Sequence, residues 1–548
     1  MTPAPEHLVA APVLLPLATA AAMLMLGAER RRLKAIINVA STALGLAIAV
    51  ALLRRVDVAA APAAFAVYLP GNWPVPYGIV LLADRLSALM VVLASCVALA
   101  ALLFALPRWQ HAGMHFHALL QLQLMGLQGA FLTADLFNLF VFVEVLLAAS
   151  YALLLHGGGL ARVRSGLHYI AINLTASLLL LVGIAVLYGV TGTLNMADIA
   201  RALPLVPASD RGLLHAGAAI LAVALLAKAA VWPLGFWLPA AYAAASAPAA
   251  AVFAILTKVG VYALVRLWTL CFPAAAGASA GFGGEALIWG GLATLGFGAL
   301  GMFASQQPAR LTGYAVMASS GTLVAAFGFG APALAAGALY YLVSSTLAAA
   351  ALFLLVELLE RSREVERGPQ GFDDGAVALV AFDEAEPAAH INLDDDERAL
   401  IGRPIPAALA FLGVTFTLCA LAVAGLPPLS GFIGKLAMLE ALLPLAGGPR
   451  WLMFALLLGS GLLAAIALVR VGIRHFWTSA ERPAPRLRLA EGVPIAALAL
   501  ALLAAVVQGG PLLAYMYAAA ASLHRPAEYI QAVMSARPVV RGSTRGTP

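Results

Sequence analysis

Charged residues, lysine and cysteine are all scarce in this chain of 548 residues. Only 11% of the residues are charged, whereas soluble domains contain about 25%. The mean hydropathy is +0.95. These values exclude an ordinary soluble domain and predict a single polytopic membrane protein.

The three cysteines, Cys96, Cys271 and Cys419, are isolated within apolar segments. This spacing argues against a disulfide framework, a zinc site or an iron–sulfur cluster, so we expect packing residues. The sequence also lacks a dinucleotide-binding or phosphate-binding glycine motif and a basic nucleic-acid surface. We therefore expect no cofactor, no bound metal and no nucleic-acid partner.

Apolar residues make up 63% of the chain and gather in about fourteen runs near the length that spans a bilayer. Backbone groups in lipid must be hydrogen-bonded internally, and these runs are too long for barrel strands of about ten residues. The sequence therefore predicts an all-α integral membrane protein of about fourteen transmembrane helices. The runs lie near 8–27, 34–53, 86–107, 116–133, 135–156, 167–190, 213–238, 248–271, 284–303, 309–328, 331–359, 405–440, 450–475 and 492–508.

Arginine outnumbers lysine by 28 to four, and three of the lysines lie inside apolar segments: Lys228, Lys258 and Lys435. Arginine stays charged almost everywhere, whereas a lysine ammonium loses its proton readily when it is removed from water. An ionisable residue inside a membrane indicates a proton or ion pathway by default. The alternative is a set of static ion pairs that fix helix packing.

Glu144 is the carboxylate that the pattern places within the membrane beside these amines. Each unpaired ion at that depth costs ~3 kcal/mol, so Glu144 and the three lysines represent roughly 10 kcal/mol. One carboxylate cannot neutralise three amines. We expect a contact between Glu144 and a lysine, because a contact that forms and breaks moves a proton.

Proline interrupts the seventh and the twelfth segments at matching places. The seventh reads AKAAVWPLGFWLP around Pro233, and the twelfth reads AGLPPLSGFIGK around Pro428. Proline removes a backbone donor and clashes with the preceding turn, so both helices are expected to unwind within the membrane. The shared core predicts an internal repeat, and paired interruptions are the best sequence indicator of a transport site.

The loops differ in charge. A basic cluster at 30–34 follows the first segment, and short loops on its side hold twelve Lys and Arg against six opposite. Because basic loops face the cytoplasm, both termini are expected outside, and the first segment is not a cleaved signal peptide.

Residues 360–403 carry a net charge of −7, leaving +13 elsewhere. We interpret them as a solvated cytoplasmic loop, with cation attraction as the alternative.

Several polar residues are weaker candidates. Asp84 and Asp135 begin helical segments, where a capping or packing role is expected. Three histidines at a helix entrance lack a matching acid or cysteine, which favours interfacial side chains over a metal site; they are His111, His115 and His117. Asn173 and Thr175 either bond between helices or line a water path. Glu357 and Glu440 are weaker candidates for an ion path, because both lie close to predicted membrane boundaries.

Four stretches carry a family resemblance: DLFNLFVFVEVLLAASYALLL (135–155), LLAKAAVWPLGFWLP (225–239), LTKVGVYALVR (256–266) and GLPPLSGFIGK (425–435). They resemble the antiporter-like, proton-translocating membrane subunits shared by respiratory complex I and Mrp-type cation/proton antiporters. The likeness is closest to the D-type member of the Mrp (also Mnh or Pha) antiporters. It extends to the tail, PAEYIQAVM at 526–534.

The resemblance implies two inverted five-helix repeats, each with one broken helix. It implies N-terminal helices at 1–115, a first repeat at 116–271, a second at 284–475 that includes the acidic loop, and a last helix with its tail at 476–548. Glu144 and Lys228 would be the acid and amine of the first half-channel. Lys258 would be the central relay, and Lys435 the terminal residue on the second broken helix.

The chain departs from its relatives in the eleventh segment. Where they usually have a histidine, it has Ser344, Ser345 and Thr346. Hydroxyls can hold a water wire but cannot store a proton. Waters or the hydroxyls of Ser319, Ser320 and Thr322 would have to bridge Lys258 and Lys435.

The expected function is therefore that of one component of a transporter, not an enzyme, in a bacterial inner membrane. It would exchange external protons for cytoplasmic Na+ or K+, assembled by resemblance with the A, B, C, E, F and G components of the same antiporter. A proton-pumping component of a complex I-like or membrane hydrogenase assembly is one alternative. A structural scaffold within the assembly is the other.

Overall fold

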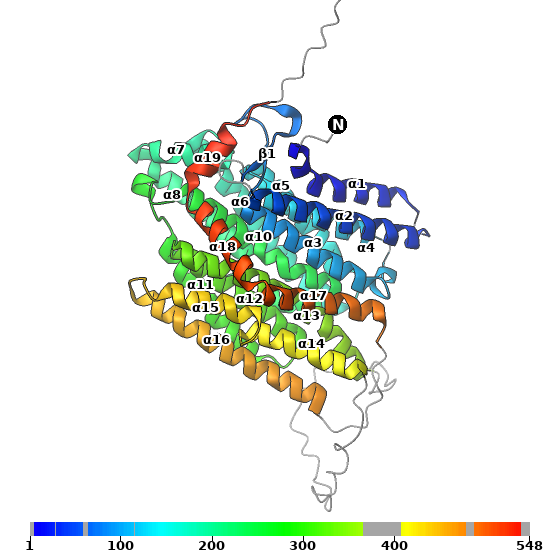
Figure 1. Ribbon diagram of the computed structural model, residues 1–548. Helices are drawn as coiled ribbons and strands as arrows, with labels where there is room; N and C mark the ends of the chain where they lie inside the picture. Colours follow the sequence, from blue (N-terminus) through cyan, green and yellow to red (C-terminus); the bar gives the residue numbers. More distant parts are fainter. Residues whose placement is uncertain are drawn as a thin grey trace, which may run out of the picture.

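The computed structural model describes residues 5–27, 29–58, 64–113, 115–364, 407–477 and 487–538. Nearly all of them are helical (Figure 1). Twelve helices within these ranges are long and apolar enough to cross a membrane, which confirms the all-α membrane fold. The count of fourteen, the inverted repeats and the domain boundaries stay predictions. The acidic loop lies almost wholly outside the described residues.

The N-terminal part of the chain forms four helices: α1 (Ala11–Met25), α2 (Arg31–Val58), α3 (Arg85–Ala105) and α4 (Phe116–Leu132). A short hairpin lies between α2 and α3, and the apolar pattern does not predict it. In this hairpin, strand β1 (Ala66–Tyr68) pairs antiparallel with β2 (Leu81–Ala83). Strand β2 ends two residues before α3 begins.

The first broken helix follows the α5–α6 hairpin. Its two halves, α8 and α9, are separated by residues 229–236, as the proline pattern predicts. Ala230 has a φ of +57°, a backbone region that costs an L-residue roughly 1–2 kcal/mol. The helices of this part are α5 (Leu136–Leu155), α6 (Leu160–Thr191), α7 (Met196–Ala202), α8 (Ala208–Lys228), α9 (Trp237–Ala244) and α10 (Ala247–Cys271).

The second broken helix consists of α14 and α15, which are separated by residues 425–429, again as predicted. Gly425 ends α14 with a φ of +72°, a conformation that glycine adopts without steric cost. The helices of this part are α11 (Gly284–Ala304), α12 (Pro308–Gly328), α13 (Pro332–Glu364), α14 (Ala407–Ala424), α15 (Ser430–Leu442) and α16 (Gly448–Gly472).

Three helices end the described chain: α17 (Leu489–Val507), α18 (Gly509–Leu523) and α19 (Pro526–Met534). The apolar pattern predicts α17 but not α18, whose 15 residues are shorter than a typical span. Helix α19 lies at the same end of the molecule as the start of α1 (Figure 1).

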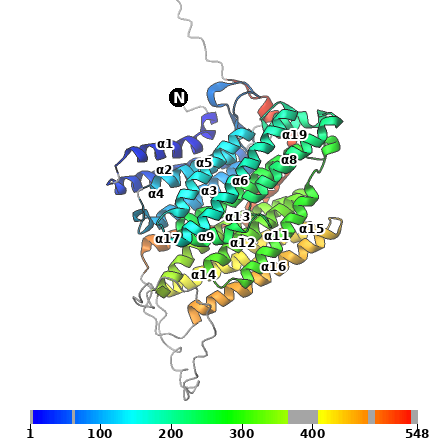
Figure 2. The same cartoon turned by 180° about the vertical axis from the view of Figure 1, so that it is seen from behind.

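The core is centred on α10, whose most apolar 18-residue stretch is completely buried inside the chain. It contacts α3 of the N-terminal part, α8 of the part with the first broken helix, and α12 and α13 of the part with the second. Seen from behind, α5, α6 and α8 lie on the near side (Figure 2). Only 39% of the most apolar 18-residue stretch of α6 is buried inside the chain. A residue in mid-α10 is therefore enclosed by protein, whereas α6 presents much of its surface to lipid or to neighbouring chains.

Candidate functional site

The three membrane lysines lie on three different helices, and all are buried. Lys228 is 7% exposed, Lys258 1% and Lys435 7%. Each ammonium donates to a hydroxyl or a backbone carbonyl. Within the described part of the chain, none of them forms an ion pair with a carboxylate.

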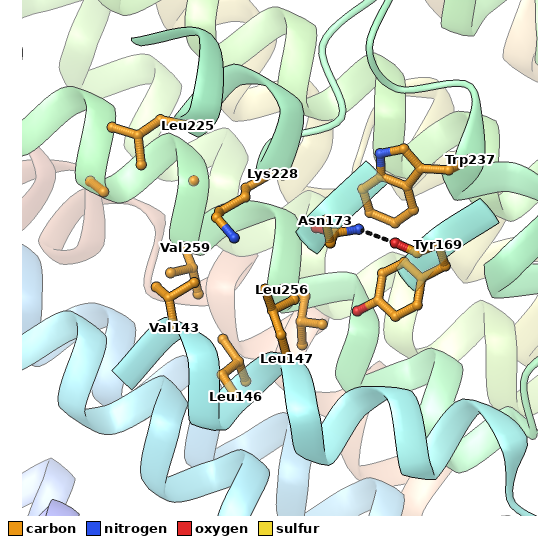
Figure 3. A pocket seen from close by; sticks show the side chains of 12 residues that line it. Val143, Leu146, Leu147, Tyr169, Asn173, Leu225, Lys228, Trp237, Leu256 and Val259 are labelled. Atoms are coloured by element: carbon orange, nitrogen blue, oxygen red, sulfur yellow. Dashed lines mark hydrogen bonds between the residues drawn. The ribbon is translucent and has the colours of Figure 1, made fainter. Parts of the chain in front are cut away.

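Lys228 is the last residue of α8, directly before the first break. Its Nζ donates to the hydroxyl of Ser177 on α6 at 2.8 Å, and Ser177 is itself buried. The ammonium points into a small cavity between α5, α6 and α10, near Val259 and Asn173 (Figure 3). The cavity has a volume of about 20 Å³, enough for about one water molecule.

Glu144 on α5 does not make the direct contact with Lys228 that we expected. Its Oε1 is buried and has no hydrogen-bond partner among the described residues, because Lys228 is turned toward Ser177. A buried acceptor without a donor costs roughly 1–3 kcal/mol. Rotation of Lys228 away from Ser177, or one water molecule, would supply the missing donor.

Lys258 lies in the middle of α10 and faces α12. Its Nζ donates to Ser319 at 2.9 Å and to Ser320 at 3.3 Å. The Ser319 hydroxyl lies 2.9 Å from that of Ser345 on α13. The hydrogen bonds thus lead from Lys258 toward α13.

Lys435 lies on α15, one and a half turns after the second break. Its Nζ donates to the carbonyl of Ala424 at 2.9 Å, one of the carbonyls that a helix end leaves without a partner. Glycine leaves room for the side chain, since a Cβ on Gly425 would lie 2.5 Å from Lys435 Cδ. Pro428 and its neighbours thus create the acceptor for Lys435, whereas the acceptor for Lys228 is a side chain of another helix.

The three hydroxyls of the eleventh predicted segment point in different directions from α13. Ser345 Oγ lies 2.9 Å from Ser319 Oγ and 3.3 Å from the Leu342 carbonyl, while Ser344 Oγ lies 2.8 Å from Ser430 Oγ on α15. Thr346 donates to the carbonyl of Leu342 on its own helix at 2.7 Å, as Thr322 does to Ala318. The Thr346 hydroxyl is therefore occupied locally and does not extend either chain of hydroxyls.

The capping role predicted for the two aspartates is confirmed. Asp84 accepts from the Ser87 amide at 2.9 Å at the start of α3, and Asp135 accepts from the Asn138 amide at 2.7 Å at the start of α5. Asp84 also binds both terminal nitrogens of Arg266 on α10, each at 2.7 Å. Sequence reasoning missed this ion pair, although an arginine inside an apolar segment is a signal for it.

The histidines at the entrance of α4 differ in exposure. His115 is exposed, and His117 is buried with its Nδ1 3.0 Å from the amide nitrogen of Asn38. This hydrogen bond anchors α4 to α2, so His117 is a packing residue of the helix entrance. His111 lies 3.5 Å from Arg31.

The remaining polar candidates resolve individually. Asn173 donates to the Tyr169 carbonyl and lines the Lys228 cavity (Figure 3), while Thr175 is exposed and bonds within its own helix. Glu357 accepts from the Trp109 indole at 2.8 Å. Glu440 is exposed at the end of α15.

Comparisons relate the chain to known membrane proteins. Residues 133–370 match a family described as "NADH:quinone oxidoreductase/Mrp antiporter, TM". The chain is 49% identical over 541 residues to the D component of a probable K+/H+ antiporter of Rhizobium meliloti (strain 1021), covering 97% of this chain and 98% of that protein. It is 32% identical over 539 residues to the D component of the Na+/H+ antiporter of Bacillus subtilis (strain 168), covering 96% and 99%.

A solved structure matches over the same extent. A chain of the Mrp complex from Dietzia sp. DQ12-45-1b is 26% identical, with a TM-score of 0.80 and coverage of 98% of this chain and 100% of that chain. Both the sequence relatives and this structure therefore span the chain from end to end.

Proposed function

The chain belongs to the D-type family of Mrp antiporter components, and on that premise we propose that it carries protons through a cation/proton antiporter of the bacterial plasma membrane. External protons enter in exchange for cytoplasmic Na+ or K+. The other membrane components, A, B, C, E, F and G by resemblance, complete the complex. Both termini lie outside, as the distribution of basic residues supports.

One observation carries this proposal: every membrane lysine has a neutral hydrogen-bond partner. A hydroxyl or carbonyl accepts from an ammonium and equally from a neutral amine. Loss of a proton therefore leaves no unpaired carboxylate behind, whereas breaking a buried ion pair costs about 3–5 kcal/mol. The arrangement favours titration over static pairing.

In this proposal Glu144 and Lys228 form the first proton-binding pair. Lys228 exchanges its bond to Ser177 for a contact with Glu144, directly or through water in the adjoining cavity. Lys258 is the central proton carrier. Lys435 is the terminal one, held at the helix end that Pro428 interrupts, and Pro233 interrupts the helix that carries Lys228.

The two broken helices would then belong to two inverted repeats, at 116–271 and 284–475. Each broken helix carries a buried lysine and an interrupting proline, which supports the repeat. Asp135 supports the path by fixing the start of α5, the helix that carries Glu144. The hydroxyls of Ser319, Ser344 and Ser345 are the supporting groups on α12 and α13.

The test uses the whole complex in everted vesicles that carry a proton gradient. Addition of Na+ or K+ is expected to dissipate the gradient when the parent chain is present, and the more effective ion is the transported cation. A complex with Lys228→Ala should assemble without dissipating it. If neither cation collapses the gradient, or if the chain purifies with flavin and iron–sulfur partners, the antiporter assignment is wrong.

A further inference from the structure

Four serines on three helices extend the polar contacts of Lys258. Lys258 and Ser345 both contact Ser319, at 2.9 Å each. Ser344 contacts Ser430 at 2.8 Å, and Ser430 is the first residue of α15, the helix that carries Lys435. Ser319, Ser344 and Ser430 are at most 2% exposed.

Helix α13 joins the two chains of hydroxyls. Ser344 and Ser345 are neighbours, and successive residues of an α-helix point about 100° apart. Ser345 therefore faces α12 while Ser344 faces α15. α13 and α15 approach closely here, because a Cβ on Gly434 would lie 2.9 Å from the backbone of Tyr341.

We propose that Ser319, Ser345, Ser344 and Ser430 form a proton relay from Lys258 to the second broken helix, in place of a histidine. Ser430 is its terminal hydroxyl and lies on α15, the helix that carries Lys435. The relay rests on the proton path proposed for Lys258 and Lys435. It adds Ser430 to that path, whereas Thr346 and Ser320 lie outside it.

Each transfer conserves protons. An N–H bond of the Lys258 ammonium breaks as an O–H bond forms at Ser319, and the hydrogen that Ser319 already carried passes to Ser345. Rotation of a serine side chain, or one water molecule, delivers a proton from Ser345 to Ser344. Ser344 then passes its own hydrogen to Ser430, and Ser430 releases the hydrogen it carried through water to the neutral amine of Lys435, so that every hydroxyl ends with one proton.

A hydroxyl suits this task because it donates and accepts at once. It holds no extra proton, so every hydroxyl must rotate back before the next proton passes. A relay of serines therefore moves protons only when Lys258 releases one. An imidazole at the same place would store a proton near neutral pH.

Two groups near the relay have no onward contact and serve as controls. Thr346 directly follows the two relay serines of α13, but its hydroxyl donates to the Leu342 carbonyl. Ser320 accepts from Lys258 at 3.3 Å, and the described residues provide it with no further hydroxyl partner. Removal of either hydroxyl should leave the relay intact.

The experiment measures cation-dependent proton exchange by the assembled complex in vesicles. Ser344→Ala and Ser430→Ala are each expected to slow exchange by about 100-fold, as for the loss of a positioned proton-transfer group. Ser430→Thr keeps a hydroxyl and should retain most of the rate. Thr346→Val should exchange like the parent. The double variant Ser344→Ala/Ser430→Ala should be no slower than either single variant, because both remove the same step.

A second readout separates a relay from a packing role. If proton transfer becomes rate-limiting, the solvent deuterium isotope effect should be larger in Ser430→Ala than in the parent. Parent-like rates in Ser344→Ala and Ser430→Ala, with exchange still abolished by Lys228→Ala, would overturn the relay alone. Parent-like rates in Lys228→Ala as well would overturn the proposed function. Equal losses in Ser430→Thr and Ser430→Ala would reduce Ser430 to a packing residue.

Discussion

Helix α10 carries two buried cations about two turns apart, Lys258 and Arg266, and their partners differ in kind. Lys258 donates to the neutral hydroxyls of α12, whereas Arg266 binds both oxygens of Asp84. Burial does not distinguish them, since they are 1% and 5% exposed. The partner does, because a bidentate carboxylate stabilises a fixed positive charge and a hydroxyl tolerates its loss.

The surroundings of Arg266 complete a structural site. The guanidinium lies over the ring of Tyr529 on α19, 5.2 Å from its centre. The hydroxyl of Tyr262, one turn before Arg266, donates to the carbonyl of Phe131 on α4 at 2.6 Å. This end of α10 thus contacts α3, α4 and the C-terminal helix α19, whereas Lys258 in the middle of α10 contacts serines of α12.

Replacement of each lysine by arginine tests this contrast most strongly. Lys258→Arg and Lys435→Arg keep the positive charge but remove the accessible neutral state, so cation-dependent exchange should be lost. A static role would survive both changes. Exchange by everted vesicles is measured from neutral to alkaline pH, with assembly checked by purification. Rates near those of the parent in both variants would show that these lysines, like Arg266, act as fixed structural charges.

Removal of the carboxylate of Glu144 or the amine of Lys228 should reduce exchange as completely as the arginine variants. Glu144→Gln and Lys228→Ala are each expected to abolish exchange while the complex still assembles, because the carboxyl and the amine exchange the proton. Thr175→Val is a matched control, since Thr175 is polar but exposed and bonded within α6. Normal exchange in either assembled variant would contradict the role of this pair.

Arg266 should respond in the opposite way to Lys258. Arg266→Gln leaves Asp84 buried without its cation and is expected to destabilise the chain by about 3–5 kcal/mol, seen as a lower Tm of the complex. Exchange per assembled complex should remain. Asp84→Asn/Arg266→Gln should recover part of the loss, because Asn also caps a helix. Loss of exchange without loss of stability would place Arg266 on the proton path.

The smallest effect is expected when a histidine replaces Ser344. Ser344→His should be tolerated, and it should shift the pH optimum of exchange toward the titration range of imidazole. By contrast, a triple apolar replacement of Ser344, Ser345 and Thr346 should slow exchange. If the triple variant matches the parent, protons do not cross α13, and electrostatics or helix movement must couple the two halves.

Local sequence chemistry predicted much of the site. Apolar runs indicated the membrane helices because their length and composition are local properties. Pro233 and Pro428 marked the two breaks because proline acts on its own turn, and Asp84 and Asp135 capped the helices that they precede. The hairpin at 66–83 and helix α18 were missed, since both are short and weakly patterned.

The sequence alone therefore determined the all-α membrane class, the broken helices and the burial of Lys228, Lys258 and Lys435. Only the tertiary structure decided what each side chain touches. Lys228 meets Ser177 across 51 residues, Ser344 meets Ser430 across 86, and Arg266 meets Asp84 across 182. Such partners depend on how each helix is rotated against its neighbours. That rotation is set by packing over the whole core, and no local pattern of residues encodes it.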